Sequence, residues 1–480
     1  MKHIGNSTYI REAVIIFFIA LVAYGYISSE RDVNINSRLA LVKAVVDEGR
    51  LEIDSYHNAE LYTNDKAYYD GHYYSDKAIG ASVLGTAVYF PLRWIYYKSD
   101  IRLTPRLFRE WITFWAIGFP SALLAPVLYL LVRRLNGGKW VAFLVTMGIC
   151  LGTPLFKYAT AFYGHTLAAV LYFLAFAIWF SIRGAAAARP ALVFLSGFLM
   201  GFAVITEYPT LILILTLIVY IIFTLYSIGQ HWNMGIYASL LSGIAIPVVL
   251  LALYNLSIYG TPLALGYLHE ADETFKEAHA ANLMGIGAPD LLVFYYQTLH
   301  PTFGIFWQCP ILLLGVVGYY FMARQTRFLP ELAFSLVSIL VYLLVISGYY
   351  MWWGGVSFTP RHIIPILPLF ALPLAFLPIR LAPVLFASAA VSLFQNLLIA
   401  ASAETGLAAY LEMVFEGKLI PIYKGSVIYD ICLPNVLGGE LMNNRGLDIF
   451  SLTGAKSLLP LFGIEILMVA LFFRMRSSAP

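Results

Sequence analysis

The uncharged stretch MGIYASLLSGIAIPVVLLALYNLS, at residues 234–257, decides what kind of protein this chain forms. It is longer than the ~20 apolar residues that a helix needs to cross a bilayer. Similar apolar runs occupy residues 111–132 and 191–228. Backbone groups in lipid must find their hydrogen-bond partners within the protein, and these runs are too long and continuous for barrel strands. The sequence therefore predicts an all-α, polytopic transmembrane helical bundle.

The composition supports a membrane protein. Hydrophobic residues make up 60% of the chain, charged residues only 12%, and the mean hydropathy is +0.77. Soluble domains carry about a quarter charged residues. The net charge of +3 is small, and no basic cluster indicates nucleic-acid binding. The three cysteines show no metal-ligand spacing, and their odd number excludes a complete set of disulfides.

Hydrophobic segments suggest about 12–14 helices in the bundle. The candidate spans are 12–29, 78–97, 110–132, 140–156, 164–182, 191–207, 209–228, 234–257, 303–323, 331–350, 362–379, 381–401 and 457–473. Lysine and arginine in short loops place both termini in the cytoplasm, which requires an even number of crossings. Segment 78–97 contains Pro91 and Arg93, so either it does not fully cross or a further crossing is hidden near it.

This orientation puts three polar loops, 30–77, 258–302 and 402–456, outside the cytoplasm. We expect residues 1–480 to form a single membrane domain without a soluble domain. Many of the 27 acidic residues fall in the first loop: Glu30, Asp32, Asp47, Glu48, Glu52, Asp54, Glu60, Asp65, Asp70 and Asp76. Such a concentration of carboxylates in a nearly apolar chain predicts that the first loop carries chemistry.

A short amphipathic helix is predicted in this first loop. Asn36 or Ser37 is the expected N-terminal cap, and Gly49 the expected end. Apolar residues between 39 and 46 share one face, opposite Arg38 and other charged residues. The helix either lies on the membrane surface or packs on the core of the protein, and the sequence fits both.

Candidate bases lie at the outer end of the first span. Glu30 and Asp32 flank Arg31, and a carboxylate held there beside lipid is suited to act as a general base. Asp65 is the third contender. Ordinary interfacial charge is the alternative for any one of these acids, and their clustering favours function.

A tyrosine-rich segment, residues 63–80, precedes the next apolar helix. Tyr73, Tyr74 and Asp76 are side chains of the kind that bind sugar hydroxyls, and Lys77 at a helix start is suited to hold a phosphate. The alternative is an interfacial turn in which Lys77 extends its ammonium towards water.

A third segment runs from Trp352 to His362 and contains WWGG followed by Pro360-Arg361. Arg361 begins a span on the outer side, and arginine is suited to bidentate phosphate contact. Further ionisable groups near membrane depth are functional candidates by default, although structural pairing explains each equally well. These pocket candidates are His165, Glu207, His269, Glu270 and His362. The spacing around His269 matches no strong metal motif, so no metal is expected.

Together these segments resemble the integral-membrane C-type (GT-C) glycosyltransferases that use lipid-phosphate sugars. The nearest likeness is to the family of protein O-mannosyltransferases and the lipid A aminoarabinose transferase. The likeness rests on Asp76-Lys77-Ala78-Ile79-Gly80, on YATAFYGH ending at His165, and on WWGG…PR ending at Arg361. The family often has adjacent Asp-Glu after the first helix, whereas Arg31 here separates Glu30 from Asp32. The identity of the base therefore stays open.

The resemblance implies an inverting glycosyltransferase with a polyprenyl-phosphate sugar donor. The acceptor would be a lipid, glycan or protein outside the cytoplasmic membrane of a bacterium or archaeon. Lys77 and Arg361 would hold the leaving phosphate, which needs no metal or other cofactor. One alternative is a transporter or flippase for a lipid-linked sugar, which would need polar residues through the bilayer midplane. Another is a lipid-linked glycan polymerase or ligase, with key residues in a late loop such as 402–456.

Overall fold

The structure, a computed structural model, describes residues 7–28, 32–98, 104–135, 138–185, 188–415 and 425–475. Within these residues, eight helices are long and apolar enough to cross a membrane: Thr8–Tyr26, Pro105–Arg134, His165–Arg183, Thr210–Ser227, Met234–Tyr259, Thr326–Ser347, Ile379–Ala401 and Gly454–Arg474. Four shorter apolar helices are Lys139–Cys150, Pro190–Thr206, Pro310–Ala323 and Arg361–Leu374. The prediction of a helical, polytopic membrane protein is confirmed.

Segment 78–97 differs from the other predicted spans. It forms helix α3 (Gly80–Lys98), which contains Pro91 and belongs to neither of these groups of apolar helices. Phe90 and Trp94 on this helix are exposed. Whether 78–97 crosses incompletely or a further crossing lies near it stays a prediction.

The chain separates into two compact units, and each is described by itself. The first unit comprises Met1–Ser28, Ser121–Thr160 and Pro289–Pro480, and the second comprises Ser29–Pro120 and Ala161–Ala288.

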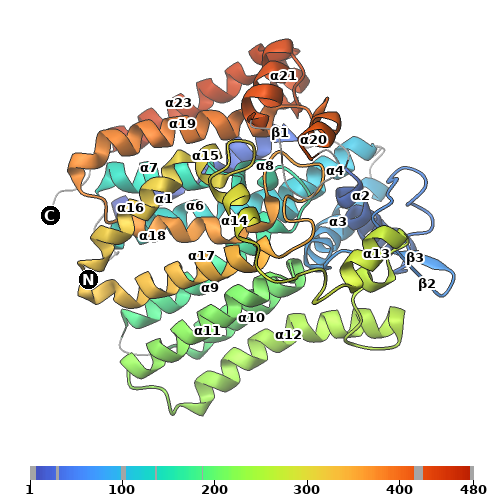
Figure 1. Cartoon of the computed structure of the whole chain (residues 1–480), viewed down its shortest axis with the longest axis horizontal. Helices are drawn as coiled ribbons and strands as arrows, with labels where there is room; N and C mark the ends of the chain where they lie inside the picture. Colours follow the sequence, from blue (N-terminus) through green and yellow to red (C-terminus); the bar gives the residue numbers. More distant parts are fainter. Residues whose placement is uncertain are drawn as a thin grey trace. The chain divides into compact units, whose positions relative to one another are not determined.

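The second unit contains the first loop and four long helices that lie side by side (Figure 1). Helix α10 packs against α9 and α12, and α11 packs against α9. The elements are α2 (Val33–Lys43), π-helical η1 (Ala44–Glu48), β2 (Ala67–Tyr69), β3 (His72–Tyr74), α3, α4 (Pro105–Thr113), η2 (Phe114–Gly118), α9 (His165–Arg183), α10 (Pro190–Thr206), α11 (Thr210–Ser227), α12 (Met234–Tyr259), η3 (Gly266–His269) and α13 (Glu273–Ala280).

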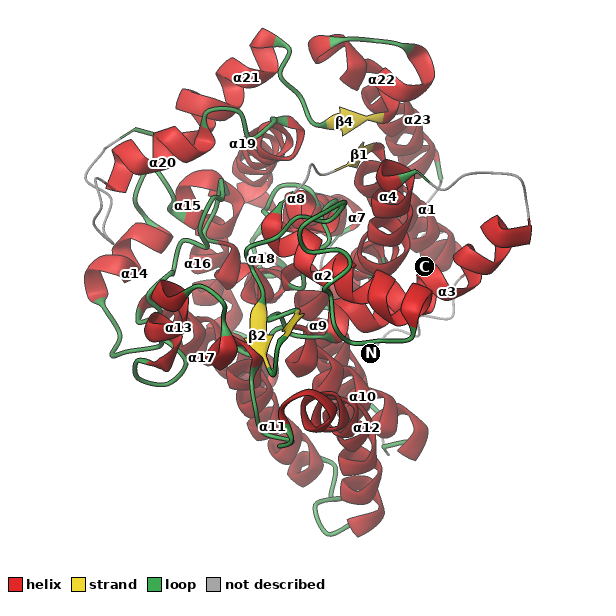
Figure 2. Ribbon diagram, turned by 90° about the vertical axis from the view of Figure 1, so that its right-hand side faces the viewer, coloured by secondary structure: helices red, strands yellow, loops and turns green. Residues whose placement is uncertain are grey.

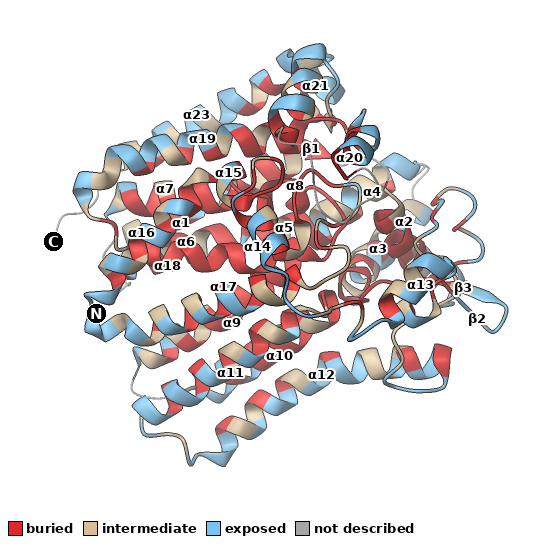
Figure 3. Ribbon diagram, in the orientation of Figure 1, coloured by how far each residue is buried: buried red, intermediate tan, exposed pale blue. Residues whose placement is uncertain are grey.

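A β-hairpin and two short helices gather at one end of this unit. Strands β2 and β3 pair antiparallel, and the hairpin lies at the same end as α2 and α13 (Figures 1 and 2). Ala67 in β2 forms an antiparallel bridge with Glu270, which ties the first loop to the segment after α12. Helix α12 itself is exposed along much of its length (Figure 3), as expected of a helix that faces lipid.

The first unit is built around α1 (Ser7–Tyr26), which packs against α6 and α23. Ile27 and Ser28, which form strand β1, pair antiparallel with Asn444 and Asn443 of β4. The remaining elements are α6 (Leu124–Arg134), α7 (Lys139–Cys150), α8 (Leu155–Ala159), α14 (Leu291–Thr298), α15 (Ile305–Gln308), α16 (Pro310–Ala323), η4 (Thr326–Phe328), α17 (Leu329–Ser347), η5 (Arg361–Phe370), α18 (Ala371–Leu374), η6 (Ile379–Leu381), α19 (Ala382–Ala401), α20 (Leu407–Phe415), η7 (Ile428–Cys432), α21 (Leu433–Gly438), β4 (Asn443–Asn444), α22 (Arg445–Phe450), η8 (Gly454–Leu458) and α23 (Leu459–Arg474), and α5 (Phe119–Ala122) joins the two units in sequence.

The predicted helix of the first loop exists, but it begins earlier than expected. Asp32 caps α2, so the prediction of Asn36 or Ser37 as the cap is wrong. Gly49 ends the following π-helical turn in the left-handed conformation, as predicted. Residues 34–42 of α2 are all buried, which favours packing on the core of the protein over lying on the membrane surface.

Candidate active site

Asp32 is held by three hydrogen-bond donors on one carboxylate oxygen. Its Oδ1 accepts from the backbone N–H groups of Asn34 at 2.8 Å and Ile35 at 3.3 Å, as an N-terminal cap does. The hydroxyl of Tyr163 donates to the same oxygen at 2.7 Å. The hydrogen bonds that described residues donate to this carboxylate all end on Oδ1, and none ends on Oδ2. One oxygen of the carboxylate is thus fixed, and the other can accept a proton.

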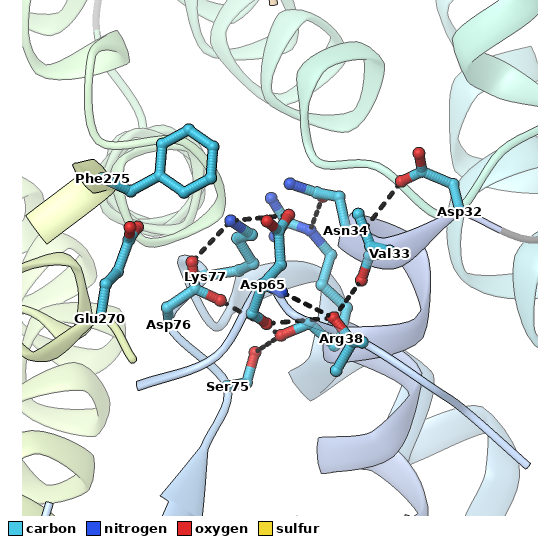
Figure 4. Close-up of polar contacts among 12 residues, drawn as sticks. Asp32, Val33, Asn34, Arg38, Asp65, Ser75, Asp76, Lys77, Glu270 and Phe275 are labelled. Carbon is cyan, nitrogen blue, oxygen red and sulfur yellow. Dashed lines mark hydrogen bonds and ion pairs between the residues drawn. The ribbon is translucent and has the colours of Figure 1, made fainter. Parts of the chain in front are cut away.

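Lys77 lies between two carboxylates. Its Nζ is 2.5 Å from Oδ2 of Asp76 and 3.0 Å from Oδ2 of Asp65 (Figure 4). The ring of Tyr267 lies 5.6 Å from the same nitrogen, and Lys77 and Asp76 are both buried. Ser37 donates its hydroxyl to the other oxygen of Asp76 at 3.2 Å. Three of the predicted site residues are therefore in direct contact.

The protonation of this cluster follows from burial and charge. Burial raises the pKa of Asp76, Lys77 lowers it, and the nearby carboxylates of Asp65 and Glu270 raise it again, to about 6. Burial disfavours the charged form of Lys77, but the two adjacent carboxylates prevail and hold its pKa well above the ordinary value. Lys77 therefore stays charged at neutral pH. An anion that approaches it must compete with carboxylates, and protonation of Asp76 weakens one competitor.

Arg38 is a buried cation, although the sequence predicted that it lies on the polar face of the helix. The residue is only 2% exposed. Its guanidinium donates to the carbonyl oxygen of Ala78 at 2.8 Å and to Oε1 of Glu207 at 3.3 Å. Because Ala78 directly follows Lys77, Arg38 fixes the backbone beside the lysine. Glu207 is also 3.4 Å from Nδ1 of His165, so two of the predicted pocket residues join this network.

Two glycines allow backbone segments to approach the network closely. A Cβ atom on Gly164 would lie 2.4 Å from Oε1 of Glu207 and 2.5 Å from the carbonyl oxygen of Thr206. A Cβ atom on Gly266 would lie 2.9 Å from Cα of Asp76. The Tyr-Gly-His sequence before α9 thus needs its glycine for packing against Glu207.

The predicted tyrosines lie on the β2–β3 hairpin, whose turn residues Asp70 and Gly71 both have positive φ. The backbone N–H of Tyr73 donates to Oδ1 of Asp54 at 2.8 Å. Tyr74 is buried in a hydrophobic cluster that includes Tyr259. The ring of Tyr73 lies against the rings of His57 and Tyr68, with centroids 4.2 and 5.0 Å away. Both tyrosines therefore pack against neighbouring side chains, and sugar binding by either stays a prediction.

Glu270 and His269 lie in the segment that follows α12. Oε1 of Glu270 is 3.3 Å from Nδ1 of His279. The negative charge of Glu270 also helps to raise the pKa of Lys77. The ring of His269 stacks on Tyr259 with centroids 4.6 Å apart, which identifies it as a packing residue. In the part of the chain that the structure describes, no group of three or more His, Cys, Asp or Glu side chains is arranged to hold a metal ion.

Arg361 and His362 belong to the first unit, whereas the residues above belong to the second. The side chain of Arg361 packs on Gly354. A Cβ atom added to Gly354 would lie 2.7 Å from Cγ of Arg361. The backbone carbonyl of His362 accepts from the hydroxyl of Tyr342 at 3.1 Å. Glu30, which was predicted as a candidate base at the outer end of the first span, lies outside the described residues.

Comparisons with known proteins identify no family for this chain. No family model and no curated protein matches it. It is similar to the crystal structure of ArnT from Cupriavidus metallidurans bound to undecaprenyl phosphate, with 12% identity, a TM-score of 0.44, and coverage of 97% of this chain and 76% of that one. The same protein in the apo state gives 13% identity, a TM-score of 0.47, and coverage of 97% and 74%. At these values neither structure establishes an activity for this chain.

Proposed function

We propose that the chain is an inverting glycosyltransferase that moves a sugar from a polyprenyl-phosphate donor to an acceptor outside the cytoplasm. The observation that carries the proposal is the carboxylate of Asp32, fixed through Oδ1 and open at Oδ2. A fixed carboxylate at the end of an apolar helical segment is suited to take a proton from an acceptor hydroxyl.

The reaction needs one proton acceptor and one cation. Asp32 Oδ2 takes the proton of the acceptor hydroxyl as its oxygen attacks the anomeric carbon. The bond between that carbon and the phosphate oxygen breaks, and the lipid phosphate leaves with both electrons. Lys77, whose charge is retained at neutral pH, stabilises the charge that develops on the phosphate. Asp65 contacts Lys77 directly, which suits it to hold the lysine more than to act as the base.

Asp76 has a part in this scheme because it competes with phosphate for Lys77. The two share a contact of 2.5 Å, so a phosphate oxygen must displace Asp76 or share the ammonium with it. Arg38 and Glu207 keep the backbone beside Lys77 in place. Arg361, in the first unit, stays a prediction for phosphate contact on its chemistry alone.

The test is transfer of labelled sugar by the purified chain in lipid nanodiscs. Candidate polyprenyl-phosphate sugars are supplied as donors, with membrane lipids and glycans as acceptors. Asp32→Asn should reduce transfer by about 100-fold or more, in the range that general bases contribute. Asparagine caps helices as well as aspartate does, so the variant should remain folded.

A matched control is Asp272→Asn. Asp272 caps α13 by accepting from the backbone N–H groups of Thr274 and Phe275, and it is exposed and makes no hydrogen bond or ion pair with Asp32, Asp76 or Lys77. This variant should keep full transfer. Equal transfer by the Asp32 variant and the control would remove Asp32 as the base. Transport of a lipid-linked sugar without transfer would contradict the glycosyltransferase assignment.

A further inference from the structure

Lys157 is a buried lysine of the first unit that donates no hydrogen bond to any described residue. It lies in α8 and is 5% exposed. Its Nζ is 3.6 Å from Oε1 of Glu404, beyond ordinary hydrogen-bond distance, and 5.5 Å from the centre of the Phe358 ring. The ring and the carboxylate attract the charge, but neither satisfies the three N–H donors. Burying donors in this state costs free energy.

Lys139 shows how the same unit treats a structural lysine. Its Nζ donates to the carbonyl oxygens of Phe472 at 2.8 Å and Met475 at 2.9 Å. A third contact, at 3.1 Å, is with Oε1 of Glu12. Two donors of Lys139 are therefore used by backbone carbonyls and its charge is paired with Glu12, whereas Lys157 donates no hydrogen bond to any described residue.

The surroundings of Lys157 bring two sequence motifs together. The hydroxyl of Tyr158 lies 2.6 Å from Oγ of Ser357, which joins the start of the YATAFYGH segment to the WWGG…PR segment. Ser357 in turn donates to the carbonyl oxygen of Thr359 at 2.7 Å. Oγ1 of Thr359 is also buried and has no hydrogen-bond partner among the described residues. Two unpartnered polar groups thus lie on the segments that this hydrogen bond connects.

We propose that Lys157 and Glu404 bind a hydroxyl group of a sugar. A hydroxyl oxygen accepts a hydrogen bond from the ammonium while its proton is donated to the carboxylate, so both partners are used. The pair is neutral as a whole, whereas a bound phosphate would place two negative charges beside each other. The side chain of Glu404 is 29% exposed and that of Lys157 is 6% exposed, so the ligand enters from the side of the carboxylate.

This inference deepens the proposed function by assigning a sugar subsite to the first unit. It rests on that function only for the statement that the bound sugar belongs to the donor or the acceptor. The subsite serves either the donor or the acceptor. Competition between a soluble glycoside and the polyprenyl-phosphate sugar would assign it to the donor. Simultaneous binding of both would assign it to the acceptor.

The test uses the full chain in nanodiscs and a panel of methyl hexopyranosides and methyl pentopyranosides. Saturation-transfer NMR should detect binding of at least one member. Lys157→Met combined with Glu404→Gln should weaken that binding at least tenfold. The double change removes both charges together, so no unpaired charge is buried and the variant should fold.

Lys139→Met combined with Glu12→Gln is the matched control. It removes another Lys–Glu pair of the same unit together with the hydrogen bonds from Lys139 to two carbonyl oxygens, so it should lower the melting temperature and leave glycoside binding unchanged. The inference is overturned if no glycoside binds the wild-type chain, or if the Lys157/Glu404 variant binds as well as the wild type. Glycoside binding is measured without any sugar transfer, so this proposal and the assignment of Asp32 as the base can fail independently.

Discussion

Tyr163 donates its hydroxyl to Oδ1 of Asp32 across 2.7 Å, although 131 positions separate the two residues. This hydrogen bond connects the turn before α9 to the start of α2. It leaves the orientation of the Asp32 carboxylate determined by two independent segments of the second unit.

Tyr163→Phe should therefore lower turnover without preventing folding. A hydrogen bond to a charged group contributes about 1.5–3 kcal/mol, which corresponds to a loss of about tenfold or more in kcat. KM should change little, because Tyr163 positions Asp32 and does not hold the substrate. Steady-state kinetics of sugar transfer measure both constants.

The control for this variant is Tyr62→Phe, since Tyr62 is 58% exposed. Its effect on kcat should be negligible. A rise in KM at unchanged kcat in the Tyr163 variant would show that Tyr163 binds substrate directly.

Arg38→Met should strongly destabilise the protein. The change leaves the carboxylate of Glu207 and the carbonyl of Ala78 buried without this partner, and breaking a buried ion pair costs about 3–5 kcal/mol of unfolding free energy. Arg38→Met with Glu207→Gln should be less destabilised than Arg38→Met alone, because the buried carboxylate is removed. Thermal or denaturant unfolding in detergent measures the difference.

An exposed pair provides the comparison. Lys276 and Glu273 are 3.0 Å apart with side chains 41% and 74% exposed. Lys276→Met should cost no more than about 1 kcal/mol. A similar small effect of Arg38→Met would contradict the burial of the Arg38–Glu207 pair.

Asp76 should make stability depend on pH in an unusual direction. Its folded pKa of about 6 lies above the ordinary value of 3.8, so the folded state binds more protons between these values. The contribution of this group to stability is therefore fully present below about pH 4 and is lost as the pH rises through about 6.

Asp76→Asn isolates this contribution. The unfolding free energy of the wild type minus that of the variant should fall between pH 4 and 6 and then level off. Melting temperatures of both proteins across this range, in one buffer series, provide the measurement. A difference that grows with pH would mean that Lys77 dominates and that the pKa of Asp76 is lowered by folding.

Gly164→Ala should destabilise the second unit, because the added methyl group would overlap Glu207 and Thr206. Overpacking of this kind costs about 1–3 kcal/mol. Gly463→Ala is the control. Gly463 lies between the two ends of α23, and a Cβ atom added there would meet no other atom within 4 Å. That change should be neutral or stabilising by up to about 1 kcal/mol. Equal melting temperatures for the two variants would contradict the close approach at Gly164.

The sequence predicted the helices better than it predicted the site. Apolar runs are local signals, and the predicted span 234–257 matches α12 within a few residues. The capping residue was missed because Asp32, Asn36 and Ser37 are all good caps by residue type. What distinguishes Asp32 is the hydroxyl of Tyr163, which no local pattern reveals.

Arg38 was missed for the same reason. It precedes the apolar residues 39–42, and a charged residue there fits a solvated helix face as well as a buried one. Its partner Glu207 is 169 positions away, so the ion pair appears only in the folded chain. The contacts of Lys77 with Asp65 and Asp76 were easier to anticipate, because all three residues lie in one short segment.

The pairing of Ile27 with Asn444 has a consequence for biosynthesis. Every residue of the second unit falls between positions 29 and 288, so its sequence is complete well before translation ends. The first unit, by contrast, includes the first helix of the chain, whose strand β1 has no partner until residue 444 has been made. The nascent chain must therefore keep its first helix in the membrane through the synthesis of more than four hundred residues before that strand can pair.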